Sequence, residues 1–473
     1  MNPKRSLVLA ALLSTAVAAT GCSTISKLNP FDKKDGNKSF ATQGQRISVI
    51  AFDQKVEPTE ALKGTEFFLP PAAERPDWKL PGGDAEQSVE HVIAAPQFEI
   101  AWKKGFGQKG NRTFHVTAPP VSADGRLFVM DGESTVSAID AKSGSTIWRK
   151  TLREASSEGK ARHGLFGFGF GGKGDRLGFG GGLAVADGKL YVSSGFRFVV
   201  QLDAATGAEG WRQSVATPIH AAPTVADGRL FVVSTDNELL TFNAATGVPG
   251  WTYQALVEPA RILAASSPAV SGDTVVTGFA SGELVALRAA NGNDLWSEAL
   301  SRASRTNALS EIRDIAGRPI IYKGDVFAVS HSGVFAATDL RTGQARWSLP
   351  VTAITTPWAA GDVVYVVDKA GEVICVSREA GQVYWIRDLN QTDKLSKRQK
   401  KKRAKHPLLW SSPVLASDRL ITLSSEGEAV ALNPKTGEVL KTLKIGGPVL
   451  IGPIAVGGMI YAVTDDAQLV AIR

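Results

Sequence analysis

Residues 203–211 read Asp-Ala-Ala-Thr-Gly-Ala-Glu-Gly-Trp, and the same pattern of a turn glycine followed four residues later by tryptophan recurs along the chain. A seventh copy runs from Asn433 to Gly437 and has Lys441 where tryptophan would stand. Six of the ten tryptophans occupy this one position, so the pattern is a true repeat and not a coincidence. The six complete pairs are Gly144 and Trp148, Gly207 and Trp211, Gly247 and Trp251, Gly292 and Trp296, Gly343 and Trp347, and Gly381 and Trp385.

Around each copy lie short apolar stretches separated by turns such as Asp187-Gly188 and Asp227-Gly228, whose glycines suit tight hairpins. An apolar middle strand recurs eight times, at 127–130, 190–193, 230–233, 274–277, 326–329, 363–366, 420–423 and 460–463. Units of roughly 40 to 60 residues with about four strands each are typical of propeller blades. The sequence therefore predicts an all-β, eight-bladed β-propeller with four-stranded antiparallel blades over residues 96–473.

The two ends of this region complement each other. The last unit stops after the strand at 469–472, without a tryptophan-bearing strand, whereas residues 98–102 include Trp102 but have no strands before them. We expect this N-terminal strand to complete the eighth blade and close the ring, which leaves no free sheet edge. Two spacings are long and indicate inserts at 154–182 and 390–407.

Residues 1–21 have the features of a signal peptide: Lys4 and Arg5, an apolar stretch over 7–19 that is too short to span a bilayer, and small residues before Cys22. The segment resembles the lipobox of bacterial lipoproteins, with Ala19 where leucine is usual. The resemblance implies that Cys22 is acylated, and Ser23 after it implies the outer membrane. Several acyl chains anchor a protein firmly. Residues 22–95, rich in proline and glycine, are expected to form a tether.

The net charge of +7 is local. Eight Lys and Arg lie between residues 394 and 405, and without these and Lys4 and Arg5 the balance is −3. A signal peptide implies export, which argues against nucleic acid as the partner. The remaining interpretations are a solvated loop or attraction to anionic headgroups or an acidic partner.

No apolar run of about 18 residues follows the N-terminus, which excludes a polytopic membrane protein. The insert at 164–174 contains a GxGxxG and a near Walker A pattern, but without a following helix we interpret it as a flexible Gly/Phe-rich loop.

The repeat resembles the quinoprotein-type (PQQ-like) propeller repeat over about residues 97–473. Two functions share that fold: the quinoprotein alcohol and glucose dehydrogenases, and the BamB family of outer-membrane assembly lipoproteins. The dehydrogenase reading requires adjacent cysteines, a calcium site and a catalytic aspartate, but Cys22 and Cys375 are the only cysteines and the six histidines are scattered. Cys375 is expected to fill the core. The resemblance implies a non-enzymatic scaffold without cofactor or metal; a quinoprotein oxidoreductase and a generic cell-envelope binding propeller remain the alternatives.

The family resemblance also implies a contact surface for the periplasmic domains of BamA, with other assembly components and nascent outer-membrane proteins as further partners. The matching loops are residues 260–268 and 309–319. Ile262 and Asp314 stand where the family has contacting residues, whereas Leu263 replaces an arginine and Ala316 an aspartate. The predicted partner-binding residues are Ile262, Leu263, Glu311, Arg313 and Asp314.

Overall fold

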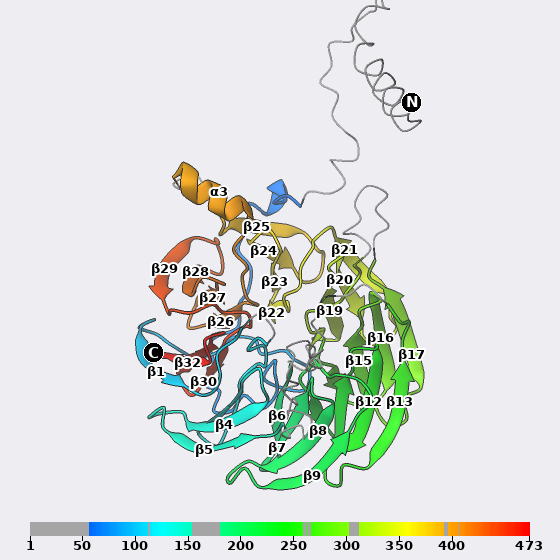
Figure 1. Ribbon diagram of the computed structural model, residues 1–473. Helices are drawn as coiled ribbons and strands as arrows, with labels where there is room; N and C mark the ends of the chain where they lie inside the picture. The colour runs from blue at the N-terminus through cyan, green and yellow to red at the C-terminus, as the bar shows by residue number, and fades with distance from the viewer. Residues whose placement is uncertain are drawn as a thin grey trace, which may run out of the picture. The chain divides into compact units, whose positions relative to one another are not determined.

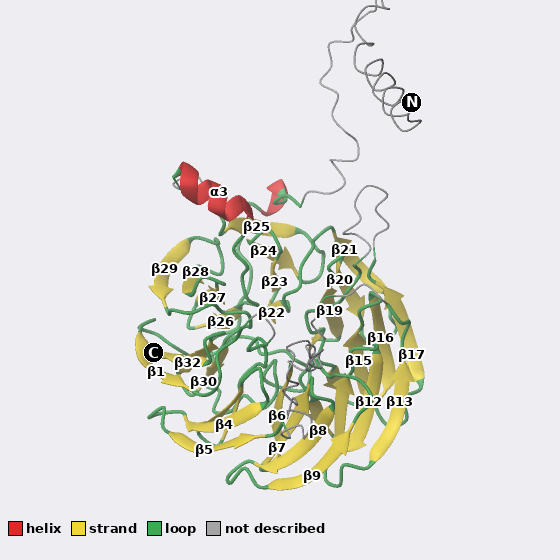
Figure 2. Ribbon diagram, in the orientation of Figure 1, coloured by secondary structure: helices red, strands yellow, loops and turns green. Residues whose placement is uncertain are grey.

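The computed structural model describes residues 56–111, 114–153, 180–258, 262, 266–301, 312–391, 396–405 and 407–473. Eight antiparallel four-stranded sheets are arranged as a ring, which confirms the predicted propeller (Figure 1). Strands dominate the described chain, with one short 3₁₀ helix, η2 (Glu60–Leu62), and one α-helix, α3 (Lys397–Lys405) (Figure 2).

The first four blades follow one another in chain order. They comprise β2 (Val121–Ala123), β3 (Arg126–Met130), β4 (Thr135–Asp140) and β5 (Thr146–Thr151); β6 (Gly181–Ala186), β7 (Lys189–Ser194), β8 (Phe198–Asp203) and β9 (Glu209–Ser214); β10 (Thr224–Ala226), β11 (Arg229–Val233), β12 (Glu238–Asn243) and β13 (Pro249–Gln254); and β14 (Ala269–Ser271), β15 (Thr274–Gly278), β16 (Glu283–Arg288) and β17 (Asp294–Ala299).

The remaining four blades complete the ring. They comprise β18 (Ile320–Tyr322), β19 (Asp325–Val329), β20 (Phe335–Asp339) and β21 (Ala345–Leu349); β22 (Trp358–Ala360), β23 (Val363–Val367), β24 (Glu372–Ser377) and β25 (Val383–Asp388); β26 (Val414–Ala416), β27 (Arg419–Leu423), β28 (Glu428–Leu432) and β29 (Val439–Lys444); and β30 (Ile454–Val456), β31 (Met459–Val463), β32 (Gln468–Ile472) and β1 (Ile100–Gly105).

The eighth blade joins the two ends of the folded region. Strand β1 pairs antiparallel with β32, with Ile100 opposite Ile472 and Trp102 opposite Ala471. The prediction that residues 98–102 close the ring is confirmed. Closure by the chain ends leaves the last blade with a paired outer strand, as in every other blade.

Each repeat tryptophan packs against the next blade and donates a hydrogen bond to it. The indole of Trp211, for example, lies over Gly247 in the following repeat copy, where an added Cβ would stand 2.5 Å from the ring. The Nε1 of the same indole donates to Ala244 O at 3.0 Å. Six indoles donate in this way to a carbonyl of the next blade, those of Trp148, Trp211, Trp251, Trp296, Trp347 and Trp385. The repeat pattern therefore describes an interface between blades as well as a turn.

The small residues of the third strands are explained by the same contact. Ala286 pairs directly with Trp296, and Cys375 pairs with Trp385. Small size would also fit crowding at the axis, but the first strands of neighbouring blades are the ones that meet around the channel. A small side chain on the third strand makes room for the indole on the fourth. Cys375 is fully buried, as predicted for a core residue.

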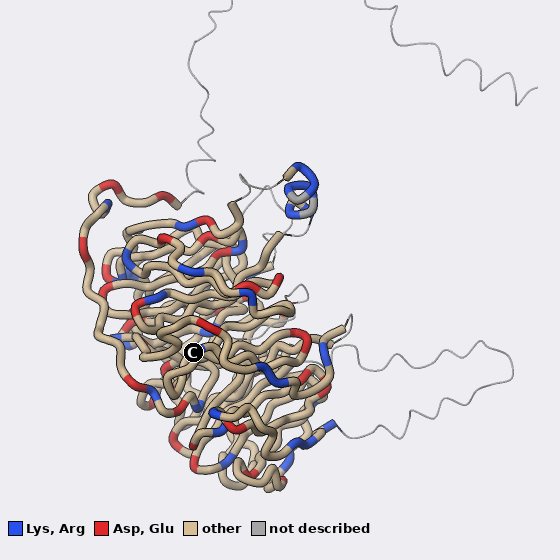
Figure 3. The backbone as a smooth tube through the Cα atoms, turned by 90° about the vertical axis from the view of Figure 1, so that its left-hand side faces the viewer, with Lys and Arg blue, Asp and Glu red and all other residues tan. Residues whose placement is uncertain are grey.

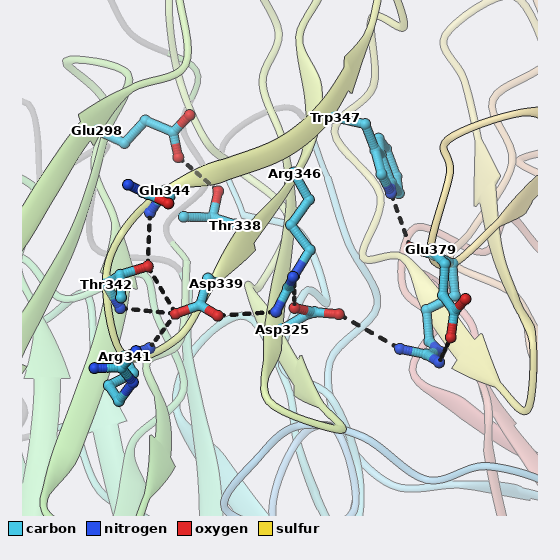
Figure 4. Close-up of polar contacts among 11 residues, drawn as sticks. Glu298, Asp325, Thr338, Asp339, Arg341, Thr342, Gln344, Arg346, Trp347 and Glu379 are labelled. Atoms are coloured by element: carbon cyan, nitrogen blue, oxygen red, sulfur yellow. Dashed lines mark hydrogen bonds and ion pairs between the residues drawn. The ribbon is translucent and has the colours of Figure 1, made fainter.

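The turn of the repeat is held by its own polar groups, as Figure 4 shows for the fifth blade. Asp339 Oδ1 accepts hydrogen bonds from the backbone N and the hydroxyl of Thr342, both at 2.8 Å. These bonds, led by that from the hydroxyl, lower the pKa of Asp339. Arg346 donates to Asp339 Oδ2 at 2.8 Å and also to Asp325. These charged residues therefore stabilise the turn and connect it to the neighbouring strand through Asp325.

The N-terminal part of the described chain corrects the expected tether. Residues 56–95 do not extend away from the body; Trp78 and Val92 are each 1% exposed. Trp78 pairs with Ser122 in the first blade, and Ala95 N donates to Gly458 O in the eighth at 2.9 Å. We call residues 75–95 the strap. Most of its apolar residues are buried on the ring, although Ile93 is exposed, so any tether ends before it. Residues 22–55 and Cys22 lie outside the described residues.

The insert at 390–407 contains α3 instead of only a loop, and Figure 3 shows its basic residues as a blue coil. The sequence Lys-Arg-Gln-Lys-Lys-Lys-Arg-Ala-Lys has no β-branched residue, proline or glycine, so its helix propensity is high despite the charge. Arg403 is tied to Glu426 by an ion pair of 3.0 Å. Most of the other insert, residues 154–179, lies outside the described part of the chain.

Candidate partner-binding face

One end of the ring carries all the segments that lead from the outer strand of a blade to the inner strand of the next. The hairpins between second and third strands open at the same end, because the four strands of a blade run antiparallel. The two predicted contact loops, at 260–268 and 309–319, are neighbouring segments of this kind. We call this end of the ring the loop face.

The structure brings the two loops together. Ile262 lies between the third and fourth blades, and Asp314 lies between the fourth and fifth. The backbone N of Ile262 donates to Asp314 Oδ2. Ile262 is half-buried, and Arg313 beside the aspartate is exposed. Leu263 and Glu311 lie outside the described residues.

Asp314 does not fit the role of a charged rim residue. It is 1% exposed, its carboxylate bonds to the neighbouring loop, and its carbonyl accepts from His331 N at 2.8 Å. A buried carboxylate that receives a backbone N–H holds a loop in place and offers little to a partner. In this structure Asp314 positions the loop, and its direct contact with a partner stays a prediction.

His331 supports the same loop from the adjacent hairpin. Its Nδ1 lies 3.3 Å from Ile312 O, and its Nε2 lies 2.5 Å from Lys369 Nζ in the sixth blade. Burial, together with the nearby Lys369 ammonium, lowers the pKa of His331. A neutral ring with its proton on Nδ1 satisfies both contacts, donating to Ile312 and accepting from Lys369.

Two exposed apolar residues beside these loops were missed by the sequence reasoning. Leu256 and Val257 are 69% and 72% exposed, more than the other large apolar residues that the structure describes. The backbone of Leu256 is held by two hydrogen bonds, since Leu256 N donates to Glu283 Oε2 at 3.0 Å and Leu256 O accepts from Asn237 Nδ2 at 2.6 Å. Their position just after a tryptophan-bearing strand is the only signal in the sequence, and it does not distinguish exposure from burial.

Two observations concern metal binding and thiol chemistry among the described residues. Among them, no group of three or more His, Cys, Asp or Glu is placed to hold a metal ion. Burial raises the pKa of the Cys375 thiol well above its usual range, which disfavours the reactive thiolate. Within the same residues, no helix is both long enough and apolar enough to cross a bilayer.

Comparison with solved structures shows the fold. The crystal structure of BamB from Moraxella catarrhalis matches with a TM-score of 0.62 and 17% identity, covering 79% of this chain and 99% of that chain. A europium-containing methanol dehydrogenase matches with the same TM-score and 14% identity, covering 82% and 89%. At these identities the likeness concerns the propeller alone.

Comparison of sequences separates the two groups. The family model described as outer membrane protein assembly factor BamB matches residues 85–165, 160–387 and 388–473. The protein of that name from Shigella dysenteriae is 30% identical over 396 residues, covering 82% of this chain and 94% of the relative. The one from Escherichia coli is 29% identical over 396 residues, with the same coverage. The chain belongs to the BamB family of outer membrane protein assembly factors.

Proposed function

We propose that this chain is a non-enzymatic scaffold lipoprotein of the β-barrel assembly machinery. In this proposal the loop face binds the periplasmic domains of BamA and so assists the insertion of outer-membrane proteins. Acylated Cys22 holds the chain at the periplasmic side of the outer membrane. The observation that carries the proposal is the family match over the propeller, together with the exposed apolar pair Leu256 and Val257 on the loop face.

The chemistry of the loop face suits a protein partner. Leu256 and Val257 supply apolar surface that loses contact with water on binding, and the hydrogen-bonded backbone of Leu256 reduces the entropy lost there. Arg313 and the predicted Glu311 add charge at the rim, where it governs orientation and specificity. Ile262 and Asp314 keep the two loops in register.

The test is capture of partners from solubilised outer membrane with the tagged full-length chain, followed by mass spectrometry. Leu256→Asp with Val257→Asp is expected to reduce the recovered BamA at least about tenfold, because charges replace the apolar contact. The matched control is Val439→Asp with Leu440→Asp, which are 51% and 52% exposed on the outer strand β29.

BamA recovered equally with both variants would remove the loop face from the proposal. If the unmodified chain captures no assembly component, the proposed scaffold role fails altogether. Dye reduction on adding quinone, calcium and an alcohol would instead favour the oxidoreductase alternative.

A further inference from the structure

The propeller channel contains a cavity of about 320 Å³. It is lined by the segments that enter the inner strands and by four strap residues, Trp78, Pro81, Gly82 and Gln87. The strap also bonds to the hairpin between the first and second strands of the eighth blade, as from Ala95 N to Gly458 O, so it lies at the end of the channel away from the loop face. We call this space the channel cavity; its size lies at the lower end for small-molecule sites.

Most of the cavity wall is apolar and aromatic. The rings of Trp78 and Trp358 stand 6.4 Å apart at 16°, and Trp410 and Ile451 also line the cavity. Trp358 Nε1 donates to Glu90 O and Trp410 Nε1 to Asn390 Oδ1, so these indoles already have their hydrogen-bond partners. Their ring faces are what they present to an occupant.

Arg318 lines the same cavity and is an unpaired cation. Its side chain makes no ion pair or hydrogen bond with any described residue, and its Nε is buried without a partner. Burial lowers the pKa of Arg318 to about 10, and no carboxylate among the described residues offsets it. The described residues that line the cavity include no Asp or Glu. Arg318 is half-buried and lacks a counterion among the described residues, so an anion in the cavity would supply the missing partner of its guanidinium.

The neighbouring polar groups are occupied in holding the wall. Thr356 Oγ1 accepts from Arg318 N at 3.1 Å, and Ser412 Oγ accepts from Thr356 N at 2.8 Å. Ser266 Oγ donates to Gly317 O at 3.1 Å. These bonds link the fourth to seventh blades around the channel and fix the backbone of Arg318. The guanidinium is positioned by the fold but not neutralised by it.

We propose that the channel cavity binds an organic anion that carries a carboxylate on an apolar body, with Arg318 pairing the carboxylate and the tryptophans covering the apolar part. A guanidinium binds a carboxylate through two parallel hydrogen bonds, which fixes its orientation. The carboxylate can belong to a free acid or to the C-terminus of a polypeptide, and both carry the same group. The contact loop at 309–319 also contributes Arg318 to the cavity wall, but Leu256, Val257 and the described ones among the predicted partner-binding residues do not line the cavity. Binding in the cavity can therefore be tested separately from partner binding.

The test is titration of the full chain with 3-phenylpropionate, monitored by tryptophan fluorescence and calorimetry. Its amide serves as the uncharged control, and inorganic phosphate tests for a simple anion site. A tripeptide ending in phenylalanine, with a free or an amidated C-terminus, separates a chain end from a free acid. We expect saturable binding of carboxylates only, with the amides at least about tenfold weaker.

Arg318→Met is expected to abolish this binding without lowering the unfolding temperature of the unliganded chain, because it removes an unpaired buried charge. A merely structural arginine would instead lower that temperature. Arg341→Met, an exposed arginine in a turn, is the matched control and should bind like the wild type. Binding of phosphate alone, equal binding of acid and amide, wild-type binding by Arg318→Met, or no binding by any probe would each overturn the proposal.

Discussion

At the scale of single residues, the contact between each tryptophan and the glycine of the next blade explains the repeat and its exception. The seventh blade has Lys441 in place of tryptophan. In the eighth blade the third strand, β32, and the fourth, β1, are not joined by a turn, so there is no turn glycine for an indole to cover. Lys441 Nζ instead donates to Gln97 O at 3.0 Å, in the segment that leads into β1. The exception at Lys441 is therefore a consequence of how β1 closes the ring.

Two kinds of turn in the third blade require glycine for different reasons: Gly228 lies between its first and second strands, and Gly247 between its third and fourth. Gly247 has φ of +74° and an added Cβ would meet Trp211, whereas Gly228 has φ of +70° and open space around it. Gly228→Ala should cost about 1 kcal/mol from the left-handed backbone alone. Gly247→Ala should cost about 1–3 kcal/mol more, since the indole must move. Urea unfolding of both variants measures the difference, and equal losses would show that the indole contact adds no stability.

At the scale of elements, α3 is the part of the structure least explained by the propeller. Its charged residues gather on a nine-residue helix that is held to the body by the pair between Arg403 and Glu426. Isolated helices of this length are marginal in water, and like charges weaken them further. An anionic surface would relieve this repulsion, which favours attraction to headgroups over a purely solvated role.

We expect a chain whose helix α3 has lost four of its seven positive charges to lose affinity for vesicles that contain phosphatidylglycerol. Exchanging Lys397, Lys400, Lys401 and Lys405 for glutamine should weaken binding at least about tenfold at low salt, because each lysine near the surface contributes about 1 kcal/mol. Vesicle co-sedimentation at rising salt measures it. The control removes the same charge from Lys63, Lys109, Lys142 and Lys444, all exposed elsewhere. Equal binding by both variants would dismiss a specific role for α3.

At the scale of the whole molecule, the strap binds every blade. The strap makes a hydrogen bond with the first strand, or with the hairpin that follows it, in each of the eight blades. The bonded residues, from the first blade to the eighth, are Ser122, Val185, Thr224, Val270, Ile321, Trp358, Leu415 and Gly458. A propeller depends on each blade packing on two neighbours. A segment bound to all of them adds a second closure at the centre, besides the one made by β1 at the rim.

Trp78→Ala should therefore destabilise the entire ring and not one blade. Loss of this buried indole is expected to cost about 3–5 kcal/mol, lowering the unfolding temperature in a single transition. Phe68→Ala is the control, since Phe68 is 57% exposed in the same N-terminal segment and should change stability by less than about 0.5 kcal/mol. Differential scanning calorimetry compares the two, and an unchanged profile for Trp78→Ala would show that the strap is dispensable for stability.

The blade count, the strand that closes the ring and the family resemblance could all be predicted from the amino-acid sequence. Each of these depends on residues repeated at fixed spacing, such as Trp211 and Gly247, so local turn chemistry and periodicity record them. The burial of Asp314, the exposure of Leu256, the strap and the unpaired Arg318 were decided only by the tertiary structure. They depend on single contacts between segments far apart in the chain, as between Trp78 and Trp358. Such contacts follow from how the ring closes in space, and no local pattern specifies them.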